Sequence, residues 1–324
     1  MKWFRRILFA LILIILLCLA AYVVSPKSNA GEMGIHLTDA DDIYAECKNT
    51  LDIFAVGNSN LFAAMTPMQL WEDYGYTSYA AGESNQMIYR SYFLLKSLID
   101  KHKPKLCILE TDVVFQYRST ASDLQSIISE YISEDFPLFE YHNRWKKLTE
   151  RDFTTVPSHN RPNVLKGYEY ITYSNPYTGG EYMNETENIE SFHKIQKFFL
   201  DKITELCKEN DIELLLIDVP SSKSWSYEKH NAIQDYADEN GLKFIDFNIN
   251  KDSFGIDWNT DTRDGGWHMN HSGAVKVTEY LGKFLDENYH LPDHRGENGF
   301  EQWANDLAEY KNCLLYTSDA ADEL

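Results

Sequence analysis

Cysteine is scarce in this chain of 324 residues: there are five, and only Cys47, Cys107 and Cys207 lie away from its two ends. An odd and widely spaced set of three does not make a disulfide framework. Cys107 stands in an apolar, strand-like run and Cys207 in a helix-like one, which is typical of thiols buried in a core. We therefore expect a fold held together by its apolar interior, and 44% hydrophobic residues supply one.

Basic residues are also in the minority, with 30 lysines and arginines against 50 acidic residues and a formal net charge of −20. The charge stays near −20 when only residues 25–312 are counted. Such a surface disfavours nucleic acid and anionic lipid headgroups as direct partners. Glycine-rich phosphate-binding signatures are missing, so nucleotide binding has no support. The Gly-x-Ser-x-Gly elbow of α/β-hydrolases is missing too, because Leu61 stands at its last position.

The N-terminus carries the one long apolar run. Lys2, Arg5 and Arg6 precede eighteen uncharged residues, Ile7–Val24, which is about the minimum for a helix that crosses a bilayer. The charges would leave the N-terminus in the cytoplasm and the rest of the chain outside. A cleaved signal peptide has the same plan, but this run is long for one and Ser25-Pro26-Lys27 is a poor cleavage site. We expect a retained anchor in residues 1–24 and a stalk in residues 25–48.

The C-terminal residues 313–324 break from the preceding composition. They resemble the translation of a sequencing adapter, so we expect the natural sequence to be represented only as far as about Lys311, where this chain would be truncated.

Between these ends, residues 49–312 alternate between short apolar runs and amphipathic segments. This alternation predicts a three-layer α/β/α sandwich around a parallel five-stranded sheet. Residues 112–185 do not fit it; they are rich in tyrosine and indicate a lid-like insertion over the binding site. We expect strands at 51–56, 76–82, 105–111, 212–219 and 242–247, and helices at 65–75, 85–103, 187–209, 227–239 and 272–288.

Two motifs carry chemistry. Gly57-Asn58-Ser59 follows the first strand, and His268 precedes the last helix. Parallel strands place both at the same edge of a sheet, where sites of such folds lie. A serine hydroxyl becomes a nucleophile when a neighbouring base takes its proton, and a carboxylate must orient that base. Asp264 and Asp261 are both near enough in sequence to do so.

The same region invites a metal interpretation, because Asp261, Asp264, His268 and His271 are close in sequence. A hydrolytic metal site needs further ligands from elsewhere in the chain. We therefore expect neither a metal nor another cofactor.

These motifs resemble those of the SGNH (GDSL-like) hydrolase superfamily, over residues 49–311. A closer resemblance is to membrane-anchored proteins of Gram-positive bacteria, distant relatives of the D-alanine transfer protein of teichoic-acid modification and of the alginate O-acetylation proteins. Both kinds work beside a membrane-bound O-acyltransferase. The segments that carry this likeness are "PMQLWEDYG", "GESNQ", "HKPKL", "YHNRW" and "HMNHSGAVKVTEYL".

The resemblance implies a flavodoxin-like sheet, with Ser59 as nucleophile, His268 as base and Asp264 as its orienting acid. Two departures stand out. Asp264 lies four residues before the histidine where the family has three, and Asp261 remains an alternative. The family's Gly-x-Asn-Asp block after the third strand is replaced by Glu110-Thr111-Asp112.

The lost asparagine removes a donor to the oxyanion, a change that costs about 2.7–4 kcal/mol of transition-state stabilisation. We expect Gly82, with Asn85 or Gln86, to replace it. Arg144 in "YHNRW" is a further candidate, for binding an anionic or carbonyl group of the substrate, and a structural ion pair is its equal alternative.

The expected function is serine-dependent O-acyl transfer or ester hydrolysis on a cell-surface polysaccharide or teichoic-acid-like polymer, outside a bacterial cell membrane. The expected partners are that polymer or an acylated carrier, and a membrane-bound O-acyltransferase. The alternative is a non-catalytic scaffold that presents polymer or carrier to the acyltransferase. A distance of about 3 Å between Ser59 and a ring nitrogen of His268 would favour catalysis.

Overall fold

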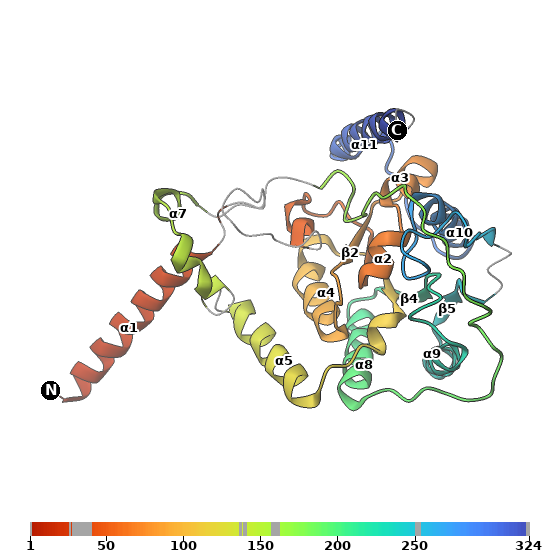
Figure 1. Ribbon diagram of the computed structural model, residues 1–324. Helices are drawn as coiled ribbons and strands as arrows, with labels where there is room; N and C mark the ends of the chain where they lie inside the picture. The colour runs from red at the N-terminus through yellow and green to blue at the C-terminus, as the bar shows by residue number, and fades with distance from the viewer. Residues whose placement is uncertain are drawn as a thin grey trace. The chain divides into compact units, whose positions relative to one another are not determined.

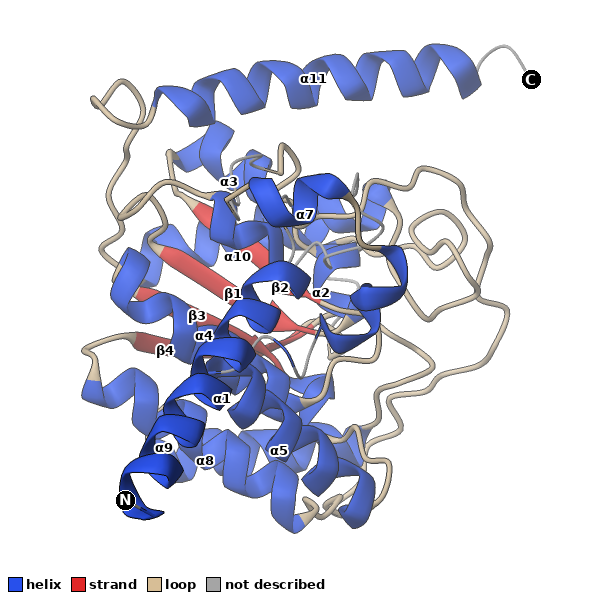
Figure 2. Ribbon diagram, turned by 90° about the vertical axis from the view of Figure 1, so that its left-hand side faces the viewer, coloured by secondary structure: helices blue, strands red, loops and turns tan. Residues whose placement is uncertain are grey.

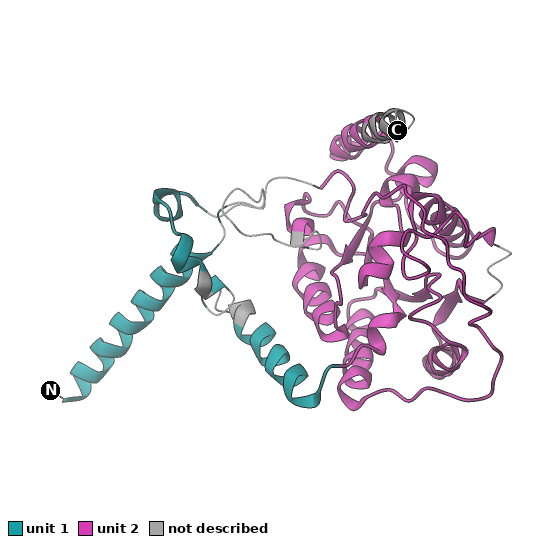
Figure 3. Cartoon of the chain, viewed as in Figure 1, with its two compact units in different colours: residues 1–37, 118–161 teal, residues 38–117, 162–324 magenta. Residues whose placement is uncertain are grey.

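The computed structural model divides the chain into two compact units (Figure 3). Unit 1 comprises residues 1–37 and 118–161, and unit 2 comprises residues 38–117 and 162–324. The segment expected to be one lid-like insertion is thus split, since its middle part groups with the N-terminal helix. The structure describes residues 2–25, 27, 41–135, 138, 141–156, 163–249 and 254–321.

Unit 2 is built on a parallel sheet of five strands in the order β2-β1-β3-β4-β5 (Figure 1). This confirms the predicted fold class, and the order is that of flavodoxin-like sheets. Nearly every strand residue is buried, because helices cover both faces and select continuous apolar runs. The strands are β1 (Ile53–Gly57), β2 (Ser78–Gly82), β3 (Leu106–Glu110), β4 (Glu213–Asp218) and β5 (Lys243–Asp246).

The helices of unit 2 form the two outer layers (Figures 1 and 2). On one face lie α4 (Ile88–His102), α8 (Lys194–Glu209) and α9 (Tyr227–Asn240), and a hydrogen bond between Thr204 and Tyr236 joins the last two. The other face carries α2 (Ser59–Ala64), α3 (Pro67–Tyr74) and α10 (His271–Asn288). The short helices η1 (Asp41–Ala45) and η2 (Thr111–Val114) complete the connections.

Helix α8 starts seven residues later than the expected helix at 187–209, which was wrong at that end. Tertiary hydrogen bonds hold the preceding residues extended. The side-chain amide of Asn231 donates to the carbonyls of Thr186 and Asn188, at 2.8 and 2.9 Å, and the Glu190 N–H donates to Glu228 O. These bonds with α9 replace the first turns of a helix.

The C-terminal helix α11 (Glu301–Ala321) was not expected. Its first turns belong to the core of unit 2, because Trp303 is fully buried with its ring 5.4 Å from that of Trp71. The ammonium group of buried Lys166 pairs with Asp306 at 2.6 Å and with Glu46 at 2.8 Å.

Unit 1 contains α1 (Lys2–Val24), α5 (Thr120–Asp135), η3 (His142–Lys147) and α7 (Glu150–Thr154). Among the described residues, α1 is the one helix that is long and apolar enough to cross a membrane. That finding agrees with the expected anchor in length and composition, and a signal sequence would pass the same criterion.

Candidate active site

Ser59 is placed by the end of β1. The strand finishes at Gly57, and Asn58 caps α2 by accepting a hydrogen bond from the Asn60 N–H at 2.8 Å. A Cβ at Gly57 would lie 2.6 Å from the Cβ of Glu110, so only glycine lets β1 and β3 run this close at their ends. The half-buried Ser59 therefore stands at the carboxyl edge of the sheet, as the sequence predicts.

His268 is carried by a tight loop that ends at the cap of α10, where Asn270 accepts the Gly273 N–H. Gly265 and Gly266 have φ angles of 75° and 99°, in the left-handed region that glycine favours. A Cβ at Gly266 would also lie 2.1 Å from Ser222 Oγ. The two glycines turn the chain back on itself and absorb the extra residue before the histidine.

The loop brings three side chains into one line. His268 Nε2 lies 2.8 Å from Ser59 Oγ, and His268 Nδ1 lies 2.5 Å from Asp264 Oδ2. The other oxygen of Asp264 accepts the backbone N–H groups of His268, at 2.8 Å, and Trp267, at 3.2 Å. Partial burial alone would raise the pKa of Asp264, but the hydrogen bonds and charge of His268 outweigh it and lower that pKa. An ionised carboxylate thus faces the ring nitrogen opposite the serine.

Asp261, the alternative partner, is placed elsewhere. It is fully buried, and its carboxylate accepts hydrogen bonds from Lys276 Nζ at 2.6 Å and Ser272 Oγ at 2.8 Å. His271 is also not part of the line Asp264–His268–Ser59, which we call the relay. Its Nδ1 lies 3.0 Å from Tyr168 Oη. Burial lowers the pKa of His271, which favours a neutral ring. Asp261 and His271 therefore make their contacts around the first turns of α10.

The tyrosine-rich segment 169–182 pairs with the loop that carries His268. The Asn175 N–H donates to Thr262 O and the Gly265 N–H donates to Asn175 O, both at 2.9 Å. Further along, the Tyr177 N–H donates to Trp258 O at 3.0 Å. This part of the expected lid fixes the histidine loop from outside, a role that the sequence gave no sign of.

A chain of hydroxyl groups links the serine helix to the same loop. Asn60 Nδ2 donates to Ser224 Oγ at 3.2 Å, Ser224 Oγ to Ser221 Oγ at 2.8 Å, and Ser221 Oγ to Trp267 O at 2.9 Å. The "VPSSKSW" segment after β4 thus contacts both the helix that begins at Ser59 and the loop that carries His268. Its Trp225 is buried, and the indole N–H donates to Asp246 at 2.8 Å.

Of the three residues expected on the oxyanion side, Gly82 lies against the serine turn. It is in register with Gly57, and a Cβ there would lie 2.7 Å from Asn58 O. Gln86 is buried and its amide donates to Ser91 Oγ at 2.8 Å. Asn85 is exposed, with a φ of 56°. The contacts described for Gln86 and Asn85 do not include Ser59.

Asp112 occupies the position of the missing asparagine. It is buried, and one of its oxygens accepts the side-chain N–H groups of Asn58 and Gln116, both at 2.8 Å. Lys229 Nζ lies 3.5 Å from the other oxygen. Burial, and then the charge of Asp112, raises the pKa of neighbouring Glu110 well above its ordinary value. An acceptor therefore stands where the resemblance leads us to expect a donor, and it engages the amide of Asn58.

Arg144 belongs to unit 1, where its guanidinium is fully engaged. One nitrogen donates to the carbonyls of Val24 and Ser25, both at 2.7 Å, and the other pairs with Asp152 at 2.5 Å. This buried arrangement stabilises the end of α1 and contains the structural ion pair that was the alternative to substrate binding.

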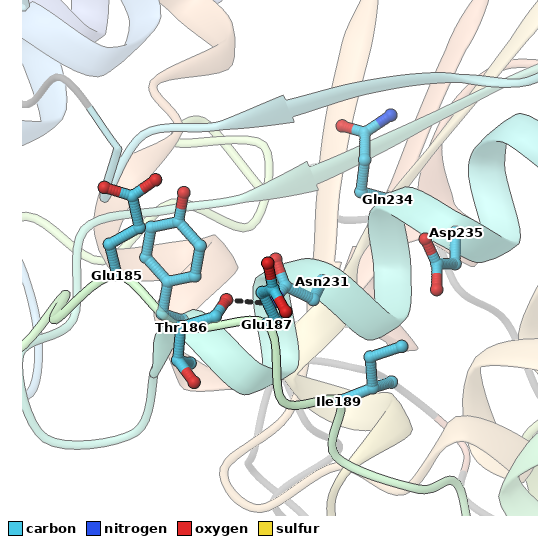
Figure 4. Close-up of a pocket in the computed structure, with 8 residues that line it drawn as sticks. Glu185, Thr186, Glu187, Ile189, Asn231, Gln234 and Asp235 are labelled. Atoms are coloured by element: carbon cyan, nitrogen blue, oxygen red, sulfur yellow. Dashed lines mark hydrogen bonds between the residues drawn. The ribbon is translucent and has the colours of Figure 1, made fainter.

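A separate hollow lies beside α9 (Figure 4). Its walls come from α9 and from the extended segment before α8, joined by the hydrogen bond between Asn231 and Thr186. The lining is mainly polar and acidic and includes none of the relay residues: it consists of Glu185, Thr186, Glu187, Ile189, Tyr227, Asn231, Gln234 and Asp235.

A scan against protein-family models and a search of curated proteins gave no match. Solved structures give weak likenesses. A GDSL-like lipase from Bacteroides thetaiotaomicron is 12% identical with a TM-score of 0.37, over 77% of this chain and 94% of that chain. The esterase EstA from a Pseudoalteromonas species is 8% identical with a TM-score of 0.38, over 73% and 97%. A lipase/acylhydrolase from Enterococcus faecalis is 10% identical with a TM-score of 0.34, over 75% and 99%. At identities and TM-scores this low, an activity has to be argued from the side chains of this chain itself.

Proposed function

We propose that this protein is a serine-dependent enzyme of acyl transfer or ester hydrolysis. The observation that supports it is the line from Asp264 through His268 to Ser59, with contacts of 2.5 and 2.8 Å. A helix cap or a surface turn would explain a serine at this position, but it would not require a histidine and a carboxylate aligned behind it. The scaffold alternative likewise gives no reason for this alignment.

The reaction follows from the geometry in two halves. Ser59 Oγ attacks the acyl carbonyl while His268 Nε2 takes the hydroxyl proton, and Asp264 stabilises the imidazolium. The ring then returns the proton to the leaving alcohol, which leaves an acyl ester on Ser59. In the second half, water or a sugar hydroxyl gives its proton to Nε2 and attacks the ester. The bond from the acyl carbon to Ser59 Oγ then breaks, and Nε2 returns the proton to Oγ, which restores the free serine and the neutral ring.

The developing oxyanion needs donors at the Ser59 turn. The candidates are the backbone N–H of Ser59 and the adjoining backbone of Gly82, since Asp112 offers only a carboxylate on this side. Each well-placed donor contributes about 2.7–4 kcal/mol to the transition state. We infer that the site works with backbone donors and without a side-chain amide.

For the substrate, we propose an acylated cell-surface polysaccharide or teichoic-acid-like polymer. The side chains of His268 and Asp264 remain 21% and 35% exposed, which is compatible with a large acceptor. Helix α1 as a retained membrane anchor would hold the site outside the cell. The proposed membrane-bound O-acyltransferase partner rests on the family resemblance.

A fluorophosphonate probe tests the proposal on the full chain in detergent, with Ser59→Ala and His268→Ala as variants. Labelling of the parent protein that both substitutions abolish is the expected result, because the probe needs an activated serine. His271→Ala serves as the matched control and should label like the parent. A folded parent protein that is not labelled would favour the scaffold alternative.

A further inference from the structure

The last turns of α1 form one wall of an apolar groove inside unit 1. The groove is shallow and open, and it offers about 650 Å³ of space, comparable in volume to small-ligand pockets. It therefore has room for a segment of an acyl chain. Its lining is apolar throughout: Leu19, Ala20, Val23 and Val24 from α1, and Leu138, Trp145, Leu148 and Phe153 from the segment around η3 and α7.

Hydrogen bonds fix the second wall to the helix. The last carbonyls of a helix lack partners within it, and here Arg144 supplies donors to Val24 O and Ser25 O. Tyr22 Oη also donates to Thr155 O at 3.1 Å. The groove is therefore a built feature of the end of α1, with η3 and α7 attached to it.

The length of α1 indicates the level in a bilayer at which the groove would lie. At about 1.5 Å per residue, the apolar run Ile7–Val24 is roughly 27 Å long, close to the 30 Å of a hydrocarbon core. The four groove residues from Leu19 to Val24 occupy its last third. If α1 spans the membrane, the groove lies where the helix leaves the outer leaflet.

The second wall of the groove, formed around η3 and α7, contains aromatic and basic residues of the kinds found at membrane interfaces. Trp145 is 65% exposed and Phe153 is 59% exposed, and tryptophan gathers at the level of lipid headgroups. Residues 142–155 also contain four basic and two acidic residues, against the strongly acidic balance of the whole chain. Apolar rings beside basic side chains match acyl chains beside phosphates.

We propose that this groove is a membrane-contact site filled by acyl chains of outer-leaflet lipids, and that η3 and α7 rest in the interface beside α1. The inference rests on the proposed role of α1 as a retained anchor. The proposal adds a second contact with lipid beside α1 itself. This contact would hold the chain at the bilayer surface where it leaves the membrane after α1. A transmembrane helix of a partner protein is the competing occupant.

The test is lipid quenching of the full chain in liposomes. A fluorophore is placed by Phe153→Cys, in a background without Cys18, Cys47 and Cys313. Lipids carry a nitroxide either near the headgroup or near the chain end. Leu13→Cys, in the middle of α1, reports on the anchor alone, and Glu239→Cys, exposed near the end of α9 in unit 2, is a control that does not line the groove.

We expect the label at 153 to lose most of its fluorescence with headgroup-proximal nitroxides and less with chain-end nitroxides, and the label at 13 to show the reverse order. The label at 239 should be quenched less than that at 153. Quenching at 13 without quenching at 153 would overturn the groove proposal while the anchor stands, and would favour a protein occupant. No quenching at 13 would overturn the anchor and the groove proposal with it. Circular dichroism checks that each labelled variant is folded.

Discussion

Replacing Asp264 by asparagine is the sharpest test of the relay, because it removes one function of the side chain and keeps another. The asparagine oxygen can still accept the backbone N–H groups of His268 and Trp267, so the loop should keep its shape. Its NH₂ group would face His268 Nδ1, where the carboxylate now accepts at 2.5 Å. The ring must then carry its proton on Nε2, and that nitrogen can no longer take the proton of Ser59.

The expected loss follows from this tautomer change. An equivalent substitution in another serine triad lowers kcat about 10⁴-fold, which corresponds to about 5.4 kcal/mol of activation free energy. The assay is kcat/KM for a p-nitrophenyl acetate ester, with the fluorophosphonate labelling rate as a second readout. Because the pKa of Asp264 is lowered, the carboxylate stays ionised between about pH 5 and pH 8, so its own titration should add no step to the parent protein's rate profile in this range.

Asp261→Asn is the matched control. It weakens a buried contact with Lys276 at 2.6 Å, so we expect a loss of stability of about 1–3 kcal/mol. The activity of the folded fraction should stay near that of the parent. An Asp264→Asn variant that kept its activity within about tenfold, or equal losses in both variants, would refute the assigned relay.

Three further substitutions, the first with a matched control, test other parts of the structure. Gly266→Ala should abolish labelling, because its Cβ would lie 2.1 Å from Ser222 Oγ at a φ of 99°; Gly241→Ala, at a φ of 65° with open space around it, should cost only about 1–2 kcal/mol of stability. Burial lowers the pKa of His102 to about 4, below its unfolded value of about 6.5, so the unfolded state binds more protons as the pH falls through this range. Between pH 7 and pH 5, the free energy of unfolding should fall by about 2 kcal/mol less in His102→Leu than in the parent protein, as measured by urea unfolding. Asp112→Asn should raise ester hydrolysis by up to about 10²-fold if a side-chain donor is what the oxyanion lacks.

The sheet could be predicted from the sequence because its strands are buried on both faces and read as unbroken apolar runs. The helix α2 could not, since six residues from Ser59 to Ala64 continue the apolar character of β1 without a helical period. The start of α8 was missed for a different reason. Its preceding residues are held by Asn231, far away in sequence.

The parts of the site whose positions follow from strand topology could be predicted from the sequence. The parts whose positions depend on loop conformation could not. Ser59 and His268 must lie at one edge once the strands are parallel. Which aspartate faces the ring depends on the φ angles of Gly265 and Gly266, and no spacing rule contains them. For Arg144 the sequence left substrate binding and a structural ion pair open. The structure has the ion pair with Asp152, and its carbonyl acceptors lie about 120 residues away in sequence.

The two departures from the family pattern therefore have unequal weight. The extra residue before His268 is neutral, because two glycines in left-handed conformation return the ring to Asp264. Asp112 differs: the resemblance leads us to expect a donor there, but Asp112 is an acceptor and binds the amide of Asn58, the neighbour of Ser59 in the chain. If the proposed function holds, a site with the Asp264–His268–Ser59 contacts but fewer oxyanion donors should form and break acyl esters slowly with small activated substrates. Binding energy from a large polymer, realised away from the reacting bond, is the means by which such a site can still reach a useful rate.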